Sequence, residues 1–470
     1  MRGGWVLAIV LAACGGGGKL VRKGDGYLDK GHYPAAIRTY KDVLDKNPDN
    51  VKALLGTARA WIAAGHPDRA ISAARRAAGL GSVEARIVLV EALVATGRGA
   101  EAVEEAERAL ASLDEGDENP KLVRLLAEAR LSTGDLAGAQ KDLATALEHM
   151  HDPELMSLAA YLAFRTGDVP RSKELIERAA DAGIGQQEIA SVEADAAALF
   201  MLFGDDDRYR ESINILKSLV PDAEHRYLEM AVSLDAAGSV ESSLRLLHWA
   251  FAIDPEDGRV ARHIGLLYHR ARSWELALGF LQRAAKLQPY ASRDSDLGVR
   301  YENKNTGSYS AEQIQTETVE LFSAMAECYD ELDRPLDAAA TWEKTLAMSN
   351  SATPADWLRV ALVWERAGEA DRAVKAAFVA VDGDSRNGEG QFLLARAYAR
   401  AGDVDNAIGR ARLAWQLLPN NPEIALFLGR LYEKRLDYGA AREAYATQIG
   451  RSPTDGRLRD ALRSLEAQGR

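Results

Sequence analysis

The stretch of sequence that decides the fold reads Gly31-His32-Tyr33-Pro34-Ala35-Ala36-Ile37-Arg38-Thr39-Tyr40. Within it, Ala36 is the first of twelve small residues that recur along the chain at a spacing centred on 34 residues. Each is Ala or Ser and follows a turn that usually contains Gly. They are Ala36, Ala70, Ala102, Ala139, Ser172, Ser212, Ser243, Ala277, Ala338, Ala373, Ala407 and Ala441. Such a period predicts an array of helical hairpins, and therefore a binding surface rather than a catalytic pocket.

A second set of small residues lies twelve positions before most members of the first set. Two helices that approach closely need small side chains at both contacts, so each pair indicates a helix crossing. The earlier members are Gly24, Ala58, Ala127, Ala160, Ala231, Gly265, Ala326, Ala361, Ala395 and Gly429, with Val90 as the exception. Prolines such as Pro48 and Pro419 are expected to end second helices, because proline has no N–H and clashes with the preceding turn.

This pattern resembles the tetratricopeptide repeat, and residues 31–40 are close to its core motif. The resemblance covers residues 17 to 454 and implies an all-α fold, a right-handed superhelix of about twelve helix-turn-helix repeats. We expect about eight repeats in 19–289 and about four in 319–454. Leu458, Leu462 and Leu465 at helical spacing predict a capping helix within 455–470, with one apolar face for the last repeat.

A polar segment at 290–318 interrupts the period. It is rich in turn residues and lacks a helical apolar stripe. Inserts of this kind are either functional or disordered, so a flexible bulge between two sub-arrays and a binding segment both stay open. If the segment binds a partner, Tyr301 and Tyr309 are the expected anchors, because tyrosine combines a large rigid ring with a polar tip.

The N-terminus predicts a lipid anchor. The apolar stretch from Trp5 to Leu11 is too short to span a bilayer, which takes about 20 residues, and is typical of a signal peptide. The sequence Leu11-Ala12-Ala13-Cys14 resembles the bacterial lipobox, which implies that residues 1–13 are removed and Cys14 is acylated. Residues 14–18 would then be the lipidated cysteine and a glycine tether. An uncleaved hydrophobic first helix or a misassigned start is the alternative.

Composition and motifs argue against several functions. The net charge of −12 disfavours a nucleic-acid partner, because phosphate neutralisation needs a basic face. The sequence has no G-x-S-x-G, phosphate-binding glycine loop, H-E-x-x-H or C-x-x-C motif. We therefore expect no catalytic residue, cofactor, metal site or small-molecule substrate. Cys328 is expected to pack as a small buried apolar residue.

The concave groove of the array is the remaining candidate site. The resemblance implies that the first helix of each repeat lines this inner surface. In the last three repeats the implied cationic residues are Arg366, Arg396, Arg400, Arg430 and Lys434. Glu365 and Glu433 interrupt this basic stripe, and earlier repeats carry charges of opposite sign, such as Arg262 and Glu320, that we expect to pair in part. If the stripe binds, arginine favours an acidic or extended segment through bidentate contacts to carboxylates.

The repeats and the anchor together predict a non-enzymatic interaction scaffold, held by lipid at the periplasmic face of the outer membrane. Its partners would be periplasmic or outer-membrane proteins of a machine for polysaccharide export, motility or secretion, as in similar tetratricopeptide lipoproteins. The alternative, from a different class, is a lipoprotein activator of a periplasmic cell-wall synthesis enzyme.

Overall fold

The computed structural model describes residues 18–113, 119–183, 190–220, 223–287, 302–303, 307–308, 311–349 and 351–467. Within these ranges the elements form twelve helical hairpins and one final helix. A two-residue antiparallel ladder, in which β1 (Glu302–Asn303) pairs with β2 (Gly307–Ser308), is the other regular element of the described residues. The predicted all-α repeat array is confirmed.

The chain separates into two units, Met1–Glu256 and Asp257–Arg470. In the first unit the first helices are 18–28, α3 (Val51–Ala63), α5 (Val83–Ala95), α7 (Pro120–Ser132), α9 (Pro153–Arg165), α11 (Ala190–Phe203) and α13 (Ala223–Ala236). Their second helices are α2 (Tyr33–Leu44), α4 (Pro67–Gly79), α6 (Gly99–Leu110), α8 (Leu136–Leu147), α10 (Val169–Gly183), α12 (Asp206–Leu219) and α14 (Val240–Ile253).

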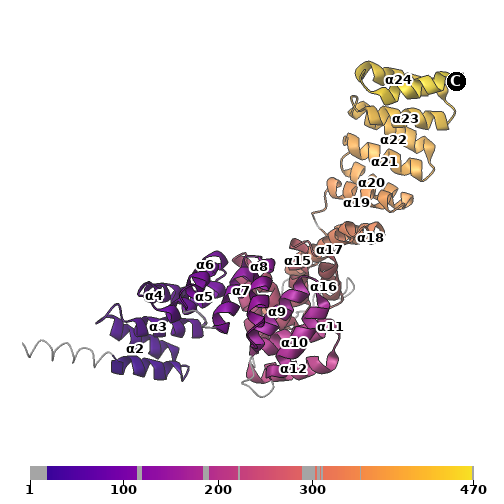
Figure 1. Cartoon of the computed structure of the whole chain (residues 1–470). Helices are drawn as coiled ribbons and strands as arrows, with labels where there is room; N and C mark the ends of the chain where they lie inside the picture. The colour runs from indigo at the N-terminus through magenta and orange to yellow at the C-terminus, as the bar shows by residue number, and fades with distance from the viewer. Residues whose placement is uncertain are drawn as a thin grey trace, which may run out of the picture. The chain divides into compact units, whose positions relative to one another are not determined.

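The second unit continues the same alternation. Its first helices are α15 (Gly258–Arg270), α17 (Ala311–Glu331), α19 (Pro354–Arg366), α21 (Gly388–Arg400) and α23 (Pro422–Lys434). Their second helices are α16 (Trp274–Lys286), α18 (Pro335–Met348), α20 (Ala370–Gly383), α22 (Val404–Leu417) and α24 (Tyr438–Arg451), followed by α25 (Gly456–Ala467). The pairs from α19 to α24 stack one on the next (Figure 1).

The small residues that define the period hold the hairpins together. All twelve lie in second helices and are buried. At two of the three serine positions, the hydroxyl donates to a backbone carbonyl of the first helix: Ser172 Oγ donates to the Ala160 carbonyl at 2.7 Å, and Ser243 Oγ to the Ala231 carbonyl at 2.8 Å. Serine is tolerated at these crossings because its buried hydroxyl is hydrogen-bonded.

Glycine is required where a tyrosine fills the crossing. Tyr40 of α2 packs against Gly24 and Gly56, and a Cβ on either glycine would collide with its ring. The hydroxyl of Tyr40 donates to Asp25 Oδ1 at 2.6 Å, which satisfies the polar tip of a fully buried side chain. One ring therefore links two successive first helices.

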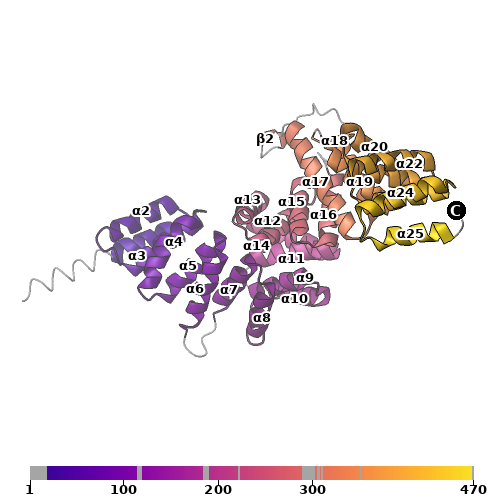
Figure 2. The ribbon, with the colours of Figure 1, turned by 90° about the horizontal axis from the view of Figure 1, so that it is seen from above.

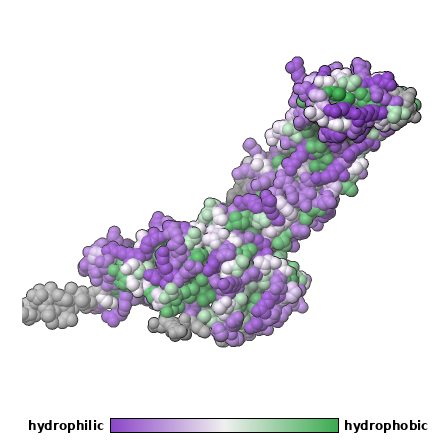
Figure 3. Space-filling view, turned by 45° about the horizontal axis from the view of Figure 1, so that its top comes forward, coloured by the Kyte–Doolittle hydropathy of each residue, from purple (hydrophilic) through white to green (hydrophobic). Residues whose placement is uncertain are grey.

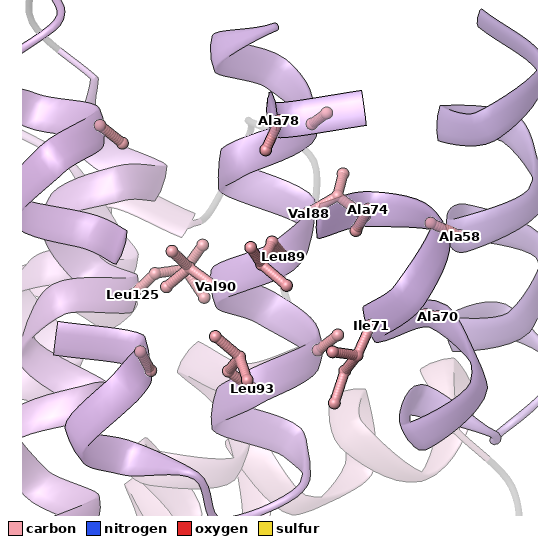
Figure 4. Packing of buried hydrophobic residues seen from close by; sticks show 14 of the residues in the cluster. Ala58, Ala70, Ile71, Ala74, Ala78, Val88, Leu89, Val90, Leu93 and Leu125 are labelled. Atoms are coloured by element: carbon pink, nitrogen blue, oxygen red, sulfur yellow. The ribbon is translucent and has the colours of Figure 1, made fainter. Parts of the chain in front are cut away.

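Val90, a larger residue at a first-helix crossing, is also buried, as is Phe200, which lies twelve positions before Ser212. Figure 4 shows Val90 beside Leu125 of α7, with Ile71 of α4 on the other side of α5. The side chain of Val90, which is larger than that of alanine, contacts the next repeat. From Leu54 of α3 to Ala129 of α7, the core thus runs on from one hairpin to the next, as stacking repeats require.

Two predictions about the second unit can be compared with the structure. α25 packs on α24 with Leu458 and Leu465 buried, at the place predicted for the capping helix. By contrast, α17 begins at Ala311, so residues 311–318 of the predicted polar insert are helical. Ile314 is only 7% exposed and starts the apolar stripe of α17 earlier than its polar neighbours suggest. Tyr301, Tyr309, Cys14 and the signal residues 1–13 lie outside the described residues.

One second helix of the first unit departs from simple stacking. α14 contacts its own partner α13 and also α11 and α7, the first helices of earlier repeats. Figure 2 shows α14 beside α11. Among the described helices, none has the combined length and apolar character of a membrane span.

Candidate partner-binding groove

Two adjacent pockets hollow the second unit, and first helices together with α25 supply their whole lining. They share Glu365, Arg396 and Arg400, and we call the combined surface the C-terminal groove. One pocket is lined by Asp330, Arg359, Leu362, Val363, Glu365, Arg366, Arg396 and Arg400. The other is lined by Glu365, Phe392, Arg396, Ala399, Arg400, Glu423, Leu426, Phe427, Arg430 and Arg457. Four of the five predicted cations therefore lie in one groove, and Lys434 does not line it.

Glu365 lies at the centre of the groove and is 4% exposed. Its Oε2 is 2.7 Å from Arg396 Nη2, and its Oε1 is 3.3 Å from Arg400 Nε. Arg400 Nη1 also donates to the Glu365 backbone carbonyl at 2.7 Å. A buried carboxylate is costly without cations or donors beside it, so these two arginines of α21 stabilise α19. Part of their charge is already neutralised.

Further ion pairs join α17 to the first helices before and after it. Arg262 of α15 lies 2.5 Å from Glu320 of α17, and Arg366 of α19 pairs with Asp330 of α17. His269 Nε2 lies 2.9 Å from Glu327 Oε2. The prediction that opposite charges pair between neighbouring repeats is confirmed.

Arg430 differs from the other predicted cations. It is exposed on α23 and lines the groove. Within the described part of the chain, neither Arg430 nor Lys434 makes an ion pair. The guanidinium of Arg430 is therefore available to an anionic ligand, whereas Arg366, Arg396 and Arg400 are engaged by carboxylates of the protein.

An aromatic pair adds an apolar surface to the groove. The rings of Phe392 and Phe427 lie 5.4 Å apart between centroids, edge to face at 81°. Sequence reasoning missed both, although they stand 35 residues apart, one repeat along the chain. Leu362 of α19, which is 48% exposed, adds an apolar side chain to the adjacent pocket. Elsewhere the surface seen in Figure 3 is largely hydrophilic, with hydrophobic residues in separate patches.

The charge of the groove is opposite to that of the chain. Six arginines line it, against the three carboxylates of Asp330, Glu365 and Glu423, so the difference is three positive charges. Arg359 and Arg457 are the arginines that the sequence did not predict. The whole chain carries −12. A local positive field of this kind attracts acidic segments.

Cys328 of α17 is a free, buried cysteine. Burial, with Glu327 nearby, raises the pKa of Cys328 to about 12, so its thiol stays protonated and unreactive. This agrees with its predicted packing as a buried apolar residue. Among the described residues, no group of three or more His, Cys, Asp or Glu is placed to hold a metal ion. The arrangement of the C-terminal groove is suited to binding.

Comparison with known proteins finds tetratricopeptide repeats in part of the chain and several solved structures that are similar to it. The tetratricopeptide repeat model matches residues 21–85, 62–120 and 228–292. No curated protein matches the sequence. YrrB, described as a TPR protein with an unusual peptide-binding site, is 15% identical over 46% of this chain and 97% of its own, with a TM-score of 0.34. MamA (41-end) from Desulfovibrio magneticus RS-1 is 17% identical over 42% and 97%, with a TM-score of 0.30. The APC/C hetero-tetramer Cut9-Hcn1 is 12% identical over 94% and 95%, with a TM-score of 0.27.

Proposed function

From the tetratricopeptide repeats that the chain carries, we propose a lipid-anchored scaffold whose C-terminal groove binds an extended, acidic segment of a partner protein. Tetratricopeptide-repeat proteins are protein-interaction scaffolds, and their partners are proteins. The observation that carries the finer proposal is the excess of arginine in the groove, with Arg430 unengaged, on a chain whose net charge is −12.

The geometry of the groove defines the ligand. A carboxylate of the partner can accept two hydrogen bonds from the Arg430 guanidinium, the strongest kind of contact such a surface offers. The Phe392–Phe427 pair can receive an apolar or aromatic side chain beside it. The partner segment therefore combines acidic residues with at least one large apolar residue.

The second part of the proposal concerns location. We propose that Cys14 is acylated and holds the protein at the periplasmic face of the outer membrane. Support comes from the small residues before Cys14 and the glycines that follow it. Two or three acyl chains are enough for stable anchoring. The partner would then belong to an envelope machine for polysaccharide export, motility or secretion.

Partner capture tests the groove. Crosslinking and mass spectrometry identify the partner, and its acidic segment is then titrated against the full chain. Arg430→Glu is expected to weaken binding by about tenfold or more, which is about 1.4 kcal/mol, because a carboxylate would face a carboxylate. Arg412→Glu is the matched control, since Arg412 is exposed on α22, a second helix that does not line the groove. Equal affinities of the two variants would contradict the proposal.

Cell fractionation tests the anchor separately. Cys14→Ala is expected to move the protein from the membrane fraction to the soluble fraction, and globomycin is expected to retain a longer precursor. A Cys14→Ala protein that stays with the membranes would refute lipid anchoring but leave the groove untouched.

A further inference from the structure

α14 occupies the inner face of the first unit. Residues Ser243 to Ala252 of this helix are all buried. It contacts α7 and α11, and Ser239, just before it, donates through Oγ to the Gly97 carbonyl between α5 and α6 at 3.3 Å. These elements belong to three different repeats, all earlier in the chain than the hairpin of α14. In the first unit, α14 therefore covers the inner surface of the first helices α7 and α11 (Figure 2). In the second unit, the corresponding surface of the first helices forms the C-terminal groove.

A buried carboxylate of α11 accepts hydrogen bonds from α14. Asp195 is fully buried, and its Oδ1 accepts from Arg245 Nε at 3.0 Å and from Trp249 Nε1 at 2.7 Å. Its Oδ2 accepts from Arg245 Nη2 at 2.7 Å. Arg245 also lies 3.3 Å from Glu128 Oε1 of α7. With α14 in place, these three bonds compensate the cost of burying the Asp195 carboxylate.

A second ion pair joins the N-terminal part of α14 to α9. Arg165 of α9 donates to Glu241 of α14 through Nε at 2.8 Å and Nη2 at 2.7 Å, and both side chains are largely buried. Further along α14, His248 Nδ1 lies 3.5 Å from the Tyr161 hydroxyl of α9. Ion pairs of this kind add specificity for one seating of the helix more than they add stability.

Two side chains of α14 bind the same carboxylate of α11. Arg245 and Trp249 lie four residues apart, hence on one face of α14, and the guanidinium lies 4.8 Å from the indole centroid. One oxygen of Asp195 accepts from both side chains. Recognition of an amphipathic helix by residues at i and i+4 is a general mode of helix-in-groove binding.

We infer that the inner face of α7, α9 and α11 is a binding site for a helix that presents an arginine and, four residues later, a tryptophan. α14 is the resident ligand of this site, supplied by the chain itself. A tethered ligand has an effective concentration in the millimolar range, so it blocks weaker competitors. A partner helix with the same arginine–tryptophan pattern displaces α14 and opens the first unit. This site is separate from the C-terminal groove and does not depend on it.

Hydrogen–deuterium exchange on the full-length wild-type protein tests whether α14 is a separable ligand. The amides of residues 240–253 are expected to exchange faster than those of α9 and α11, because a bound ligand leaves its site without unfolding it. Exchange of α14 only together with α9 and α11 would make it an inseparable part of the core and would overturn the inference. No substitution is needed, so this result does not depend on the folding of a variant.

A peptide of residues 239–254, labelled with fluorescein, tests the site directly on the full chain. Arg245→Glu in the chain places a third carboxylate beside Asp195 and Glu128 and expels α14, so the wild-type peptide is expected to bind this variant at least tenfold more tightly than wild type. Arg226→Glu, at an exposed position of α13, is the matched control and is expected to behave as wild type. A peptide that carries the Arg245→Glu change is expected to bind none of them.

Two outcomes would contradict the inference. Equal affinity of the peptide for wild type and for a folded Arg245→Glu variant would show that the surface does not bind α14 as a ligand. A mass in solution of two chains, reduced to one by Arg245→Glu, would show that α14 fills the site of a second copy and would overturn its assignment as an intramolecular ligand.

Discussion

Glu365 connects the charge of the C-terminal groove with the stability of the second unit. From the sequence it appears only as an interruption of a basic stripe, because a charged residue on a first helix is ordinarily solvated. Its 4% exposure results from the side chains of α21 that close over it. Arg396 and Arg400 therefore serve the fold, and Arg430 is left for a ligand.

This assignment predicts an asymmetry in stability. The double substitution Arg396→Ala with Arg400→Ala is expected to lower the free energy of unfolding of the second unit by about 2 kcal/mol, because it leaves a buried carboxylate without partners. Glu365→Gln is expected to cost less than about 1 kcal/mol, since the two guanidinium groups are 38% and 53% exposed and can be hydrated. Urea denaturation of the three proteins measures both values, and equal losses would contradict the role of Glu365.

His248 makes the first unit sensitive to acid. Complete burial, with Arg165 nearby, lowers the pKa of His248 to about 3 from an ordinary value of 6.5. Below pH 6.5 the unfolded chain therefore binds a proton that the folded chain does not, and the stability contributed by neutral His248 is lost as the pH falls toward 3. His248→Gln is expected to reduce the loss of stability between pH 7 and about pH 5, where carboxylates titrate little. Parallel curves for wild type and variant in urea denaturation would refute this.

At the scale of helices, α25 has the clearest energetic role. Leu458 is fully buried and Leu465 is 1% exposed, so the helix covers the apolar end of α23 and α24. Leu458→Ala is expected to destabilise the second unit by about 2–4 kcal/mol through lost burial and a cavity. Arg463→Ala, on the wet face of α25, is the control and is expected to change stability by less than about 0.5 kcal/mol. A thermal transition of the second unit that is unchanged in Leu458→Ala would count against a capping role.

Most helices of the array could be predicted from the sequence, but not every boundary and contact. A small residue at one fixed position, Ala or Ser, identifies each of the twelve second helices, because small side chains permit two backbones to cross closely. The start of α17 was missed since one buried residue, Ile314, stands among polar neighbours. The seating of α14 could not be predicted, because it depends on how far seven successive hairpins curve, and that is a sum of many small crossing angles.

At the scale of the whole molecule, the candidate groove was predicted in position and only partly in chemistry. The resemblance to the tetratricopeptide repeat implied that Arg396, Arg400 and Arg430 lie on one inner surface, and all three line the C-terminal groove. Which of them binds a ligand depends on carboxylates that come from the neighbouring repeat. Phe392 and Phe427 carry a recognisable signal, one repeat apart, but an aromatic residue on a helix is more often part of the core.

The ion pairs between successive first helices also limit how this array can vary. Arg262 needs Glu320 of the following repeat, Arg366 needs Asp330 of the preceding one, and Glu365 needs the two arginines of the next. Hairpins of the second unit are consequently not interchangeable modules. Removing one, duplicating one or reordering them would bring like charges together or leave Glu365 without a cation, so the order of the repeats is itself encoded in their inner faces.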